Sequence, residues 1–278
     1  LSKRIPVGRK KLSMIGIIVA AGLGSRMGAR GKARPKCLLP IAGRSLLDRT
    51  VENLQAAGCE KIVVVTGHLA EMIRHPDIAT VHNADYFDNN ILCSLMHARD
   101  YLNGPVVISY SDIWVEPWIY GELIDTPGDL VLAVDRDWQP YYHQRSDHPI
   151  SEAENVFVRD DNRVVEIGKH LGANAPAERL CGEFLGLWRM SAEGSALFRE
   201  AFDKLDAQLD PLAPFQQALE WRKAYITDII QFLVNQGNRI DCALIARGWA
   251  ELDTVQDYER LSAIAARQRL GTIINAGE

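Results

Sequence analysis

A segment near the start of the chain combines glycines with positively charged residues at short spacings. In chain order, its informative residues are Gly22, Gly24, Arg26, Pro35 and Lys36. Glycines let backbone N–H groups approach a polyphosphate closely, and fixed Arg and Lys side chains neutralise the charge that builds on it. The composition and order of this segment therefore favour a loop that binds phosphate groups.

Two commoner glycine-rich motifs do not fit the segment. The dinucleotide-binding motif G-x-G-x-x-G requires a third glycine, and Met27 stands at that position. A P-loop requires Gly-Lys and then Ser or Thr after four spacer residues, and no such run follows here. A simple glycine turn would explain Gly22 and Gly24, but not the Arg26 and Pro35-Lys36 that follow in this order.

Asp112 and Asp253 are candidates for a metal site. Asp112 comes just past an apolar segment over 105–109, which we expect to be a central strand, and open α/β sheets bind ligands where such strands end. Mg²⁺ prefers one or two carboxylates together with phosphate oxygens and water. Two alternatives stay open: Asp112 could be a turn residue, and Asp253 could cap a helix that begins at Thr254.

Segments with strand and helix periodicity alternate along the chain, which predicts an α/β protein with a doubly wound sheet. We expect strands over residues 15–21, 61–66, 80–82, 105–109, 130–134, 183–190 and 239–245, and a hairpin over 157–167 that turns at 160–162. We expect helices over 46–54 before Gly58, over a short stretch before Pro76, and over 88–98, 192–205, 227–234 and from 254. Residues 136–154 have no clear period and are predicted to form a functional loop or lid. The prediction is a single domain over 14–278 with an acceptor-binding lobe over about 136–190.

The composition of the 278-residue chain argues against several classes of protein. A hydrophobic content of 47% suffices for one large core, and the net charge of −5 argues against nucleic acid binding. No apolar run approaches the roughly 18 residues of a membrane span, and no signal-peptide pattern is present. The five cysteines are scattered, which favours reduced thiols in a cytoplasmic protein. We expect residues 1–13 to be a disordered basic extension and Met14 to be the native start.

The chain resembles the nucleotidylyltransferases, whose signature is G-x-G-x-R followed by P-K. From Met14 to about residue 265 it is similar to the cytidylyltransferases that activate phosphocholine or phosphonates. The greatest similarity is to the cytidylyltransferase domain fused to phosphoenolpyruvate mutase in phosphonate pathways such as that of fosfomycin. Besides the signature, the stretches that carry the resemblance are residues 89–91, 94–95, 111–117, 135–138, 152–154, 167–169, 182–186, 227–228 and 249–257.

The resemblance implies a Rossmann-like mixed sheet of the nucleotide-diphospho-sugar transferase type and a reaction with CTP as donor. A phosphonate or phosphate oxygen of a small acceptor attacks the α-phosphorus of CTP, and pyrophosphate leaves. Such a transition state needs charge stabilisation and in-line positioning more than an acid or a base. Mg²⁺ is the implied cofactor, with Asp112 and Asp253 as its ligands, and a homodimer is the assembly to consider.

The resemblance also assigns roles to individual residues. The expected catalytic residues are Arg26 at the β- and γ-phosphates, Lys36 at the α-phosphate and Lys169 at the acceptor phosphonate. The expected nucleotide-binding residues are Ala20, Ala21, Gly22, Leu23, Gly24, Ser25, Asn89 and Ser94. Simpler alternatives stay open, because Lys169 could be an exposed lysine and Asn89 or Asn90 could be a helix N-cap.

The expected acceptor-binding residues are Asp135, Asp137, Tyr142, Arg145, Glu154 and Glu183. Acidic and aromatic residues between 135 and 154 could form a cage for a cationic group, as in aminoethylphosphonate or choline. Arg145 and His148 in the same segment would equally suit a hydroxyl or a carboxylate. A solvated charged loop would explain the same composition.

Two other functions share much of this pattern. A sugar-1-phosphate nucleotidylyltransferase would have Arg26, Lys36 and both aspartates, but it would carry a Glu-Lys-Pro acceptor loop, where this chain has Ile-Gly-Lys-His over 167–170. A nucleotide-sensing domain of the same fold would be expected to lose one of these four charged residues, and all four are present. The sequence therefore favours a cytidylyltransferase for a small phosphonate such as hydroxyethyl- or aminoethylphosphonate, with phosphocholine as the nearest alternative.

Overall fold

The computed structural model describes residues 13–171 and 179–268, so the extension predicted over 1–13 lies outside the described residues except for Ser13. In this part of the chain the main sheet has nine strands, seven of them in the order β10-β9-β11-β6-β1-β4-β5, and β8 pairs with both β11 and β12. The strands are β1 (Met14–Ala20), β4 (Cys59–Thr66), β5 (Ile78–His82), β6 (Val106–Tyr110), β8 (Leu130–Asp135), β9 (Glu154–Val158), β10 (Val164–Lys169), β11 (Leu180–Met190) and β12 (Asp241–Ile245). The predicted α/β class with a mixed sheet is confirmed.

The parallel part of the sheet places the glycine-rich segment next to Asp112. β1 pairs in parallel with β4 on one side and with β6 on the other. The order of the strands therefore changes direction between β1 and β6, and open α/β sheets bind ligands at the carboxyl ends of strands at such a point. The loop from Gly22 follows the carboxyl end of β1, and Asp112 follows the carboxyl end of β6.

Strand β11 joins this parallel part to an antiparallel part. Its residues 180–183 pair with β9, and its residues 187–190 pair with β6. The pairing with β8 shifts its register between Phe184 and Trp188, and Gly186, with φ +77°, lies inside this shift. The hairpin predicted after residue 157 is confirmed as the antiparallel pair β9-β10.

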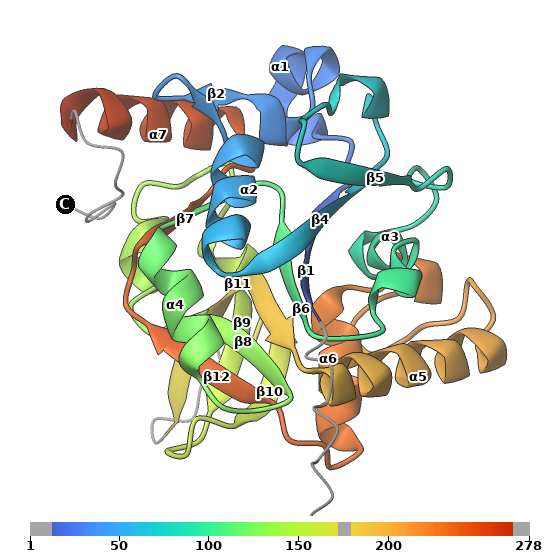
Figure 1. Ribbon diagram of the computed structural model, residues 1–278. Coiled ribbons are helices and arrows are strands. Elements are labelled where there is room, and N and C mark those ends of the chain that lie inside the picture. Colours follow the sequence, from blue (N-terminus) through green and yellow to red (C-terminus); the bar gives the residue numbers. More distant parts are fainter. Residues whose placement is uncertain (1–12, 172–178, 269–278) are drawn as a thin grey trace, which may run out of the picture.

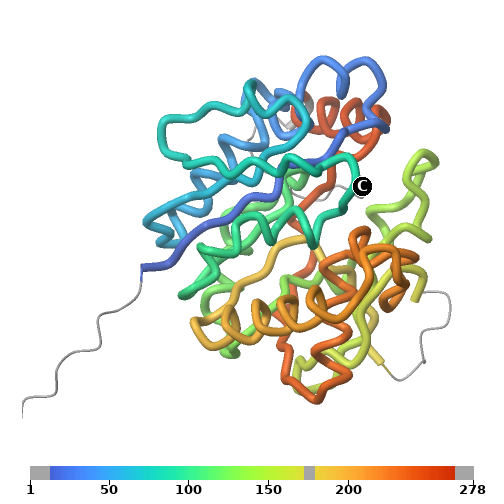
Figure 2. The backbone as a smooth tube through the Cα atoms, turned by 90° about the vertical axis from the view of Figure 1, so that its right-hand side faces the viewer, coloured from blue at the N-terminus to red at the C-terminus, as the bar shows by residue number. Residues whose placement is uncertain are grey.

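Helices cover both faces of the sheet, because alternate residues of each strand point to opposite faces. Ile17 and Val19 of β1 belong to a core shared with α3, α5 and α6, whereas Ile18 and Ala20 belong to a core shared with α2 and α4. Figure 1 shows α2 and α4 on the left of the sheet, and Figure 2 shows the molecule from the side of α5 and α6. The helices are α1 (Gly28–Ala33), α2 (Leu46–Ala56), α3 (Ile91–Met96), α4 (Pro117–Asp125), α5 (Ala192–Gln208), α6 (Ile226–Asn235) and α7 (Val255–Gln268).

A small separate ladder brings together two distant parts of the chain. β13 (Trp249–Glu251) pairs antiparallel with β7 (Ile113–Val115). Beyond its end, the backbone N–H of Leu252 donates a hydrogen bond of 2.7 Å to the carbonyl of Asp112. Asp112 precedes β7 and Asp253 follows β13, so antiparallel pairing sets these two aspartates side by side. A two-stranded ladder, β2 (Pro40–Ile41) with β3 (Arg44–Ser45), forms the connection before α2.

Most predicted elements are confirmed with small shifts at their ends, but six were missed and one interpretation was wrong. The missed elements are α1, β2, β3, α4, β7 and β13. The segment over 136–154 contains two 3-10 turns, Gln139–Tyr142 and Ile150–Glu152, and it buries Arg145 and His148. This segment is therefore part of the core and not a solvated charged loop.

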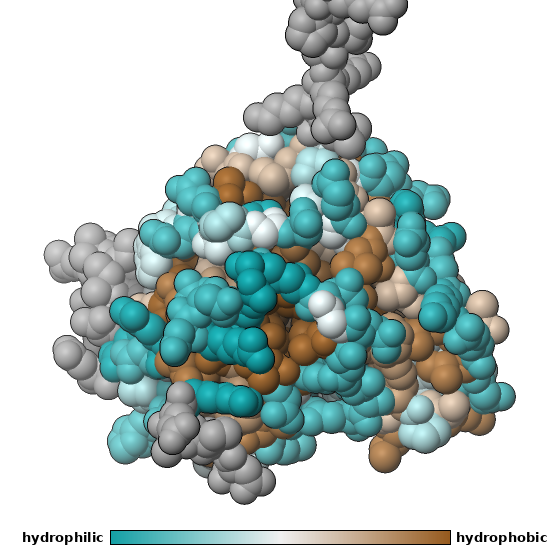
Figure 3. Space-filling model, turned by 90° about the horizontal axis from the view of Figure 1, so that it is seen from below, coloured by the Kyte–Doolittle hydropathy of each residue, from teal (hydrophilic) through white to brown (hydrophobic). Residues whose placement is uncertain are grey.

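The surface of the described residues is typical of a globular domain. Among the helices that the structure describes, none is long and apolar enough to cross a membrane. The face seen from below mixes strongly hydrophilic residues near its middle with smaller hydrophobic areas (Figure 3). Such a mixture is the normal state of a protein surface.

Gly186→Ala tests whether the register shift in β11 requires a glycine, and Gly121→Ala in α4 is the comparison. Gly186 has a positive φ, and a Cβ atom there would lie 2.2 Å from the ring of Tyr110. We expect Gly186→Ala to lower the free energy of unfolding by about 2 kcal/mol or more. Gly121 lies in α4 with open space around its Cα, so Gly121→Ala should raise the same free energy by up to about 1 kcal/mol. Chemical denaturation measures both, and a Gly186→Ala variant as stable as the wild type would contradict the strained bend.

Candidate active site

A cleft of about 310 Å³ opens at the carboxyl ends of β1 and β6, and we call it the main cleft. It lies where the order of the strands changes direction, as expected for the ligand site of an open α/β sheet. Most of the residues predicted for the site line this cleft. They are Ala20, Ala21, Gly22, Leu23, Gly24, Ser25, Arg26, Lys36, Asn89, Ser94, Asp112, Glu154 and Asp253.

The glycine-rich loop makes a tight turn that leaves little room for side chains. Gly24 has φ +61°, and its carbonyl accepts a hydrogen bond of 3.0 Å from the backbone N–H of Met27. A Cβ atom on Gly31 would lie only 2.1 Å from the same carbonyl oxygen. Gly31 is thus a third glycine that the loop requires, and the sequence analysis did not single it out.

Lys36 is the centre of the charged group in the main cleft. Its ammonium donates hydrogen bonds of 2.8 Å to Asp112 Oδ2 and 2.8 Å to Asp253 Oδ1. Burial by itself would lower the pKa of Lys36, but the two carboxylates raise it above its ordinary value. Lys36 therefore stays protonated, as an ammonium group between two carboxylates.

Asp253 has two further partners besides Lys36, namely a guanidinium group and an imidazole ring. Arg26 Nη1 lies 2.7 Å and His148 Nδ1 lies 2.6 Å from its Oδ2 atom. Burial would raise the pKa of Asp253, but the hydrogen bond from His148 and the charge of Lys36 hold this pKa well below its ordinary value. Asp253 is therefore a carboxylate, although its side chain is only 3% exposed.

Thr254 and Asp257, not Asp253, cap helix α7. The Oδ2 atom of Asp257 accepts hydrogen bonds from the backbone N–H groups of Thr254 at 2.8 Å and Asp253 at 3.1 Å. The hydroxyl of Thr254 accepts one of 3.2 Å from the backbone N–H of Asp257. These reciprocal bonds form a capping box. The capping alternative for the side chain of Asp253 is thus wrong, and its carboxylate is left to the cations of the cleft.

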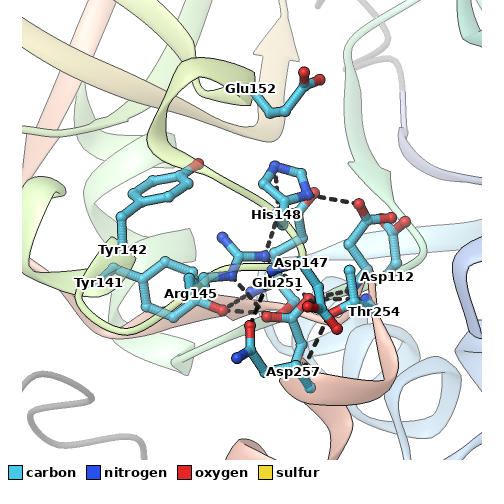
Figure 4. Close-up of polar contacts among 12 residues, drawn as sticks. Asp112, Tyr141, Tyr142, Arg145, Asp147, His148, Glu152, Glu251, Thr254 and Asp257 are labelled. Atoms are coloured by element: carbon cyan, nitrogen blue, oxygen red, sulfur yellow. Dashed lines mark hydrogen bonds and ion pairs between the residues drawn. The ribbon is translucent and has the colours of Figure 1, made fainter.

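Arg145 was predicted to bind the acceptor, but the structure places its side chain among carboxylates of the protein and away from the main cleft. The guanidinium is fully buried, with Nε 2.6 Å from Asp257 Oδ1 and Nη2 2.9 Å from Glu251 Oε2. Arg145 lines neither the main cleft nor a second, smaller cavity beside that cleft. Figure 4 shows Arg145 beside Tyr141 and between these two carboxylates. Arg145 thus fixes the segment over 136–154 to β13 and α7.

Asp135 and Asp137 also lie outside the cleft, against the prediction that they bind the acceptor. Asp135 is buried and accepts hydrogen bonds from the backbone of Asp137 and Arg247 and from the indole of Trp249. Asp137 forms an ion pair of 2.6 Å with Arg247. Both carboxylates stabilise the connection between β8 and β13, because polar groups that are buried or half-buried there need hydrogen-bond partners.

A smaller cavity of about 80 Å³ adjoins the main cleft, and we call it the inner cavity. The two cavities share four lining residues, namely Arg26, Tyr110, Glu154 and Glu251. Four residues predicted for the acceptor end line the inner cavity: Tyr142, Glu154, Lys169 and Glu183. His148, Glu152 and Glu251 line it as well, and the site prediction did not include them.

Lys169 is the last residue of β10. Its ammonium lies 3.6 Å from Glu152 Oε2 and 4.7 Å from the centre of the Tyr225 ring. Its side chain is 21% exposed. Lys169 is therefore not the freely exposed lysine of the alternative interpretation.

Asn89 and Ser94 are held on the wall of the main cleft by a third polar residue. Asn83 is fully buried, and its Nδ2 donates hydrogen bonds of 2.9 Å to Asn89 Oδ1 and 3.0 Å to Ser94 Oγ. Asn90 occupies the N-cap position of α3 without a capping bond from its side chain, which donates to the carbonyl of Lys223 instead. The structure therefore gives Asn89 and Asn90 no role as side-chain caps.

His148 and Glu251 are the most important omissions from the predicted site. One ligand atom from each of His148, Glu251 and Asp253 lies within 4.8 Å of the other two, so these residues form a group that could hold a metal ion. A lone histidine in an irregular segment and a glutamate in a three-residue strand carry no periodic signal. Only the fold brings them together.

Glu154→Gln tests the electrostatics of the two cavities. Burial raises the pKa of Glu154 to about 7, although Lys169 opposes the rise. In the unfolded chain this pKa is near 4.3. Between these two pH values the folded protein binds more protons, so its stability falls as the pH rises, and the loss is complete above about pH 7. Gln carries no charge, so the variant should raise the melting temperature at pH 8 more than at pH 5.

Glu166→Gln is the matched control, because Glu166 is exposed on β10 and lines neither cavity. Thermal melting of both variants at the two pH values gives the comparison. An equal shift for Glu154→Gln at pH 5 and pH 8 would contradict the raised pKa.

Known proteins resemble this chain over most of its length. A CTP:phosphoglutamine cytidylyltransferase of Campylobacter jejuni is 26% identical over 257 residues, which cover 88% of this chain and 98% of that protein. A 2-aminoethylphosphonate cytidylyltransferase of Lancefieldella rimae is 31% identical over 166 residues, and the chain spans 60% of its length. The solved structure of a CTP:phosphocholine cytidylyltransferase of Streptococcus pneumoniae has a TM-score of 0.69 at 19% identity, over 91% of this chain and 99% of that one.

The structural likeness confirms the predicted nucleotide-diphospho-sugar transferase type of fold. The family model of MobA-like NTP transferase domains matches residues 16–174, which contain the glycine-rich loop, Lys36 and Asp112. The matched region covers more than half of the chain and confirms the predicted nucleotidylyltransferase class. The chain belongs to the family of MobA-like NTP transferase domains.

Proposed function

We propose that the protein transfers the CMP group of CTP to a small phosphonate or phosphate acceptor and releases pyrophosphate. The observation that carries the proposal is the meeting of Lys36, Asp112 and Asp253 beside the glycine-rich loop in the main cleft. The names of the relatives from C. jejuni and L. rimae support CTP as the donor, since both are named cytidylyltransferases. Both names also pair the donor with an acceptor that carries a phosphate or phosphonate group.

Arg26 and the backbone of the glycine-rich loop are the proposed holders of the β- and γ-phosphates. The side chain of Arg26 is 54% exposed in the cleft, so it can exchange Asp253 for a phosphate oxygen without leaving a buried site. Helix α1 (Gly28–Ala33) follows the loop, but it is too short for its dipole to contribute much to phosphate binding. Fixed donors and cations are what a triphosphate in such a loop requires.

Lys36 is proposed to stabilise the charge that develops around the α-phosphorus. In the reaction an oxygen of the acceptor forms a bond to the α-phosphorus while the bond to the pyrophosphate oxygen breaks. The acceptor oxygen is already anionic, so the protein mainly has to position the reactants and neutralise charge. Lys36 suits this role because its two carboxylate partners keep it protonated and fixed.

Asp112 and Asp253 are the proposed ligands of Mg²⁺. Their oxygens converge on the ammonium of Lys36, so the structure already places one cation between them. Carboxylates with room for phosphate oxygens are the ligands that Mg²⁺ prefers. The ion would neutralise the triphosphate and orient it.

Other interpretations of the site are less well supported. A nucleotide-sensing domain would not need the complete charged group that meets in the main cleft. A sugar-1-phosphate acceptor is less well supported because residues 167–170 lack the Glu-Lys-Pro sequence expected of that branch. A homodimer, a cytoplasmic location, the separate acceptor lobe and the fusion with phosphoenolpyruvate mutase stay predictions.

A pyrophosphate-release assay tests the proposed reaction. CTP, UTP, ATP and GTP are each combined with Mg²⁺ and with aminoethylphosphonate, hydroxyethylphosphonate, phosphocholine or glucose-1-phosphate. We expect kcat/KM with CTP and a phosphonate to exceed the value with any other nucleotide by about tenfold or more, because base edges are distinguished by hydrogen bonds that the wrong base leaves unpaired. Equal release from UTP with glucose-1-phosphate would move the protein to the sugar branch.

Lys36→Met tests whether Lys36 and the metal ion share one site. Methionine keeps much of the side-chain volume but removes the positive charge between Asp112 and Asp253. Without nucleotide, we therefore expect the variant to bind Mn²⁺ about tenfold more tightly than the wild type, a difference of about 1.4 kcal/mol. Electron paramagnetic resonance of free Mn²⁺ measures the binding directly and needs no turnover.

Lys32→Met is the matched control, since Lys32 is exposed in α1 and lines neither cavity. Its Mn²⁺ affinity should equal that of the wild type. Asp253→Asn should weaken the binding, because it removes one anionic ligand. If Lys36→Met binds Mn²⁺ as the wild type does, Lys36 and the ion occupy different sites.

A further inference from the structure

The residues that line the inner cavity include more carboxylates than cationic side chains. Four carboxylates line it, from Glu152, Glu154, Glu183 and Glu251. Two of them have cationic partners, because Glu251 contacts Arg145 at 2.9 Å and Glu152 contacts Lys169 at 3.6 Å. Among the described residues, the other two have phenols as their hydrogen-bond partners: Glu154 accepts a long hydrogen bond of 3.4 Å from Tyr110, and Glu183 accepts one from Tyr142. The deeper wall of the cavity is thus rich in carboxylate and poor in cations.

Glu183 has an oxygen atom that no residue satisfies. Its side chain lies on β11 and is buried, and Tyr142 donates to its Oε1 atom. The Oε2 atom is buried as well, and it accepts no hydrogen bond from any residue in the described ranges 13–171 and 179–268. Buried polar atoms in folded proteins nearly always have a partner, and an exception requires an explanation. Because Glu183 lines the inner cavity, the missing partner can come from a ligand.

Nearby charges of the protein do not replace this partner. Burial raises the pKa of Glu183 well above its ordinary value, and Glu251 and Asp135 raise it further, while Arg145 offsets only part of the rise. The carboxylate form of Glu183 is therefore costly unless a cation lies beside it. A cation placed against Oε2 would remove this cost.

The other walls of the inner cavity suit a small cation that still has polar hydrogens. Rings of Tyr110, Tyr142, Phe184 and Trp249 line it, and aromatic rings attract cations through their faces. With about 80 Å³ against about 310 Å³ for the main cleft, the cavity suits a small group such as an ammonium on a short alkyl stem.

We propose that the inner cavity binds the primary ammonium group of the acceptor, with Glu183 Oε2 as its partner and Tyr142 as the residue that positions Glu183. This proposal rests on the proposed function, since it names the far end of the same acceptor. Lys169 and Arg26 also line the inner cavity, and Arg26 belongs to the main cleft as well. The acceptor is therefore a zwitterion, with its phosphonate toward Lys169 and its ammonium toward Glu183.

The geometry distinguishes an ammonium group from its closest substitutes. A hydroxyl group could donate one hydrogen bond to Oε2, but it would not compensate the buried negative charge. A trimethylammonium group has the charge but has no N–H to donate, and it needs more room. A methyl group offers neither. Hydrogen bonds between charged groups are the strong ones, so the ammonium group should be preferred over all three.

A matched series of acceptors tests the proposal on the wild-type protein. The four phosphonates carry the same two-carbon stem and end in –NH₃⁺, –OH, –CH₃ or –N(CH₃)₃⁺. They are 2-aminoethylphosphonate, 2-hydroxyethylphosphonate, propylphosphonate and 2-(trimethylammonio)ethylphosphonate. With CTP and Mg²⁺, we expect kcat/KM for aminoethylphosphonate to be about 10- to 100-fold above that for each of the others, the range expected for one charged hydrogen bond.

Glu183→Gln tests whether the carboxylate of Glu183 binds the ammonium group of the acceptor. The variant keeps the shape and the hydrogen bond from Tyr142 but removes the charge, so kcat/KM for aminoethylphosphonate should fall about 10- to 100-fold. The value for propylphosphonate should not fall, since this acceptor has no group that needs the charge. Glu166→Gln, the same change at an exposed position of β10, should alter neither value. Thermal melting checks that Glu183→Gln is folded.

The outcomes separate this proposal from the proposed function. If hydroxyethylphosphonate or propylphosphonate reacts as well as aminoethylphosphonate, the ammonium site is wrong while the transferase stands. Equal losses for aminoethyl- and propylphosphonate in Glu183→Gln would also overturn the ammonium site. If no acceptor releases pyrophosphate, the proposed function fails. Calorimetric binding of the four phosphonates then still tests the ammonium site, which requires aminoethylphosphonate to bind most tightly.

Discussion

The candidate site depends on one buried carboxylate, that of Asp253. Its two oxygen atoms contact Lys36, Arg26 and His148 at 2.6–2.8 Å. A carboxylate with a side chain only 3% exposed is stable as an anion only when cations or donors surround it. Arg26 and Lys36 come from the segment near the start of the chain, and His148 comes from a segment more than 100 residues later. A single charge therefore holds the glycine-rich loop, the turn at Lys36 and the segment over 136–154 against the start of α7.

Two features of the fold hold this carboxylate in place. The ladder of β13 with β7 sets Asp253 beside Asp112, and the capping box of Thr254 and Asp257 starts α7 immediately afterwards. Asp257 also contacts Arg145, which in turn contacts Glu251. Buried charges that are satisfied by one another in this way resist rearrangement, because breaking one pair leaves an uncompensated charge in the interior. The network of buried charges therefore supports Asp253 on the wall of the main cleft.

The sequence was sufficient to predict the parts of the site that depend on local spacing. The glycine-rich loop, Lys36 and Asp112 follow the ends of strands that are clear from their apolar runs, and these residues meet in the main cleft. The ladder of β7 and β13 was not predictable, because strands of three residues have no measurable period. No local pattern separated the acidic residues that serve the fold, Asp135 and Asp137, from those that line the cavities, Glu154 and Glu183, because their partners come from distant parts of the chain.

The carboxylates of the site fall into two groups according to their partners. Asp253 and Asp257 have cationic partners within the protein, and their pKa values are lowered despite burial. Glu154 and Glu183 form no ion pair with a cation among the described residues, and burial raises their pKa values. The same chemical group is thus held in two different environments within the site. Cations of the protein compensate Asp253 and Asp257, whereas Glu183 keeps an oxygen atom without a partner among the described residues. Glu154 and Glu183 come from β9 and β11 and not from the loop that carries Arg26, so a change of side chain there would alter the proposed acceptor site without disturbing the charges around Lys36. The names of the three relatives agree with this separation, since they share CTP or the cytidylyl group and differ in the acceptor.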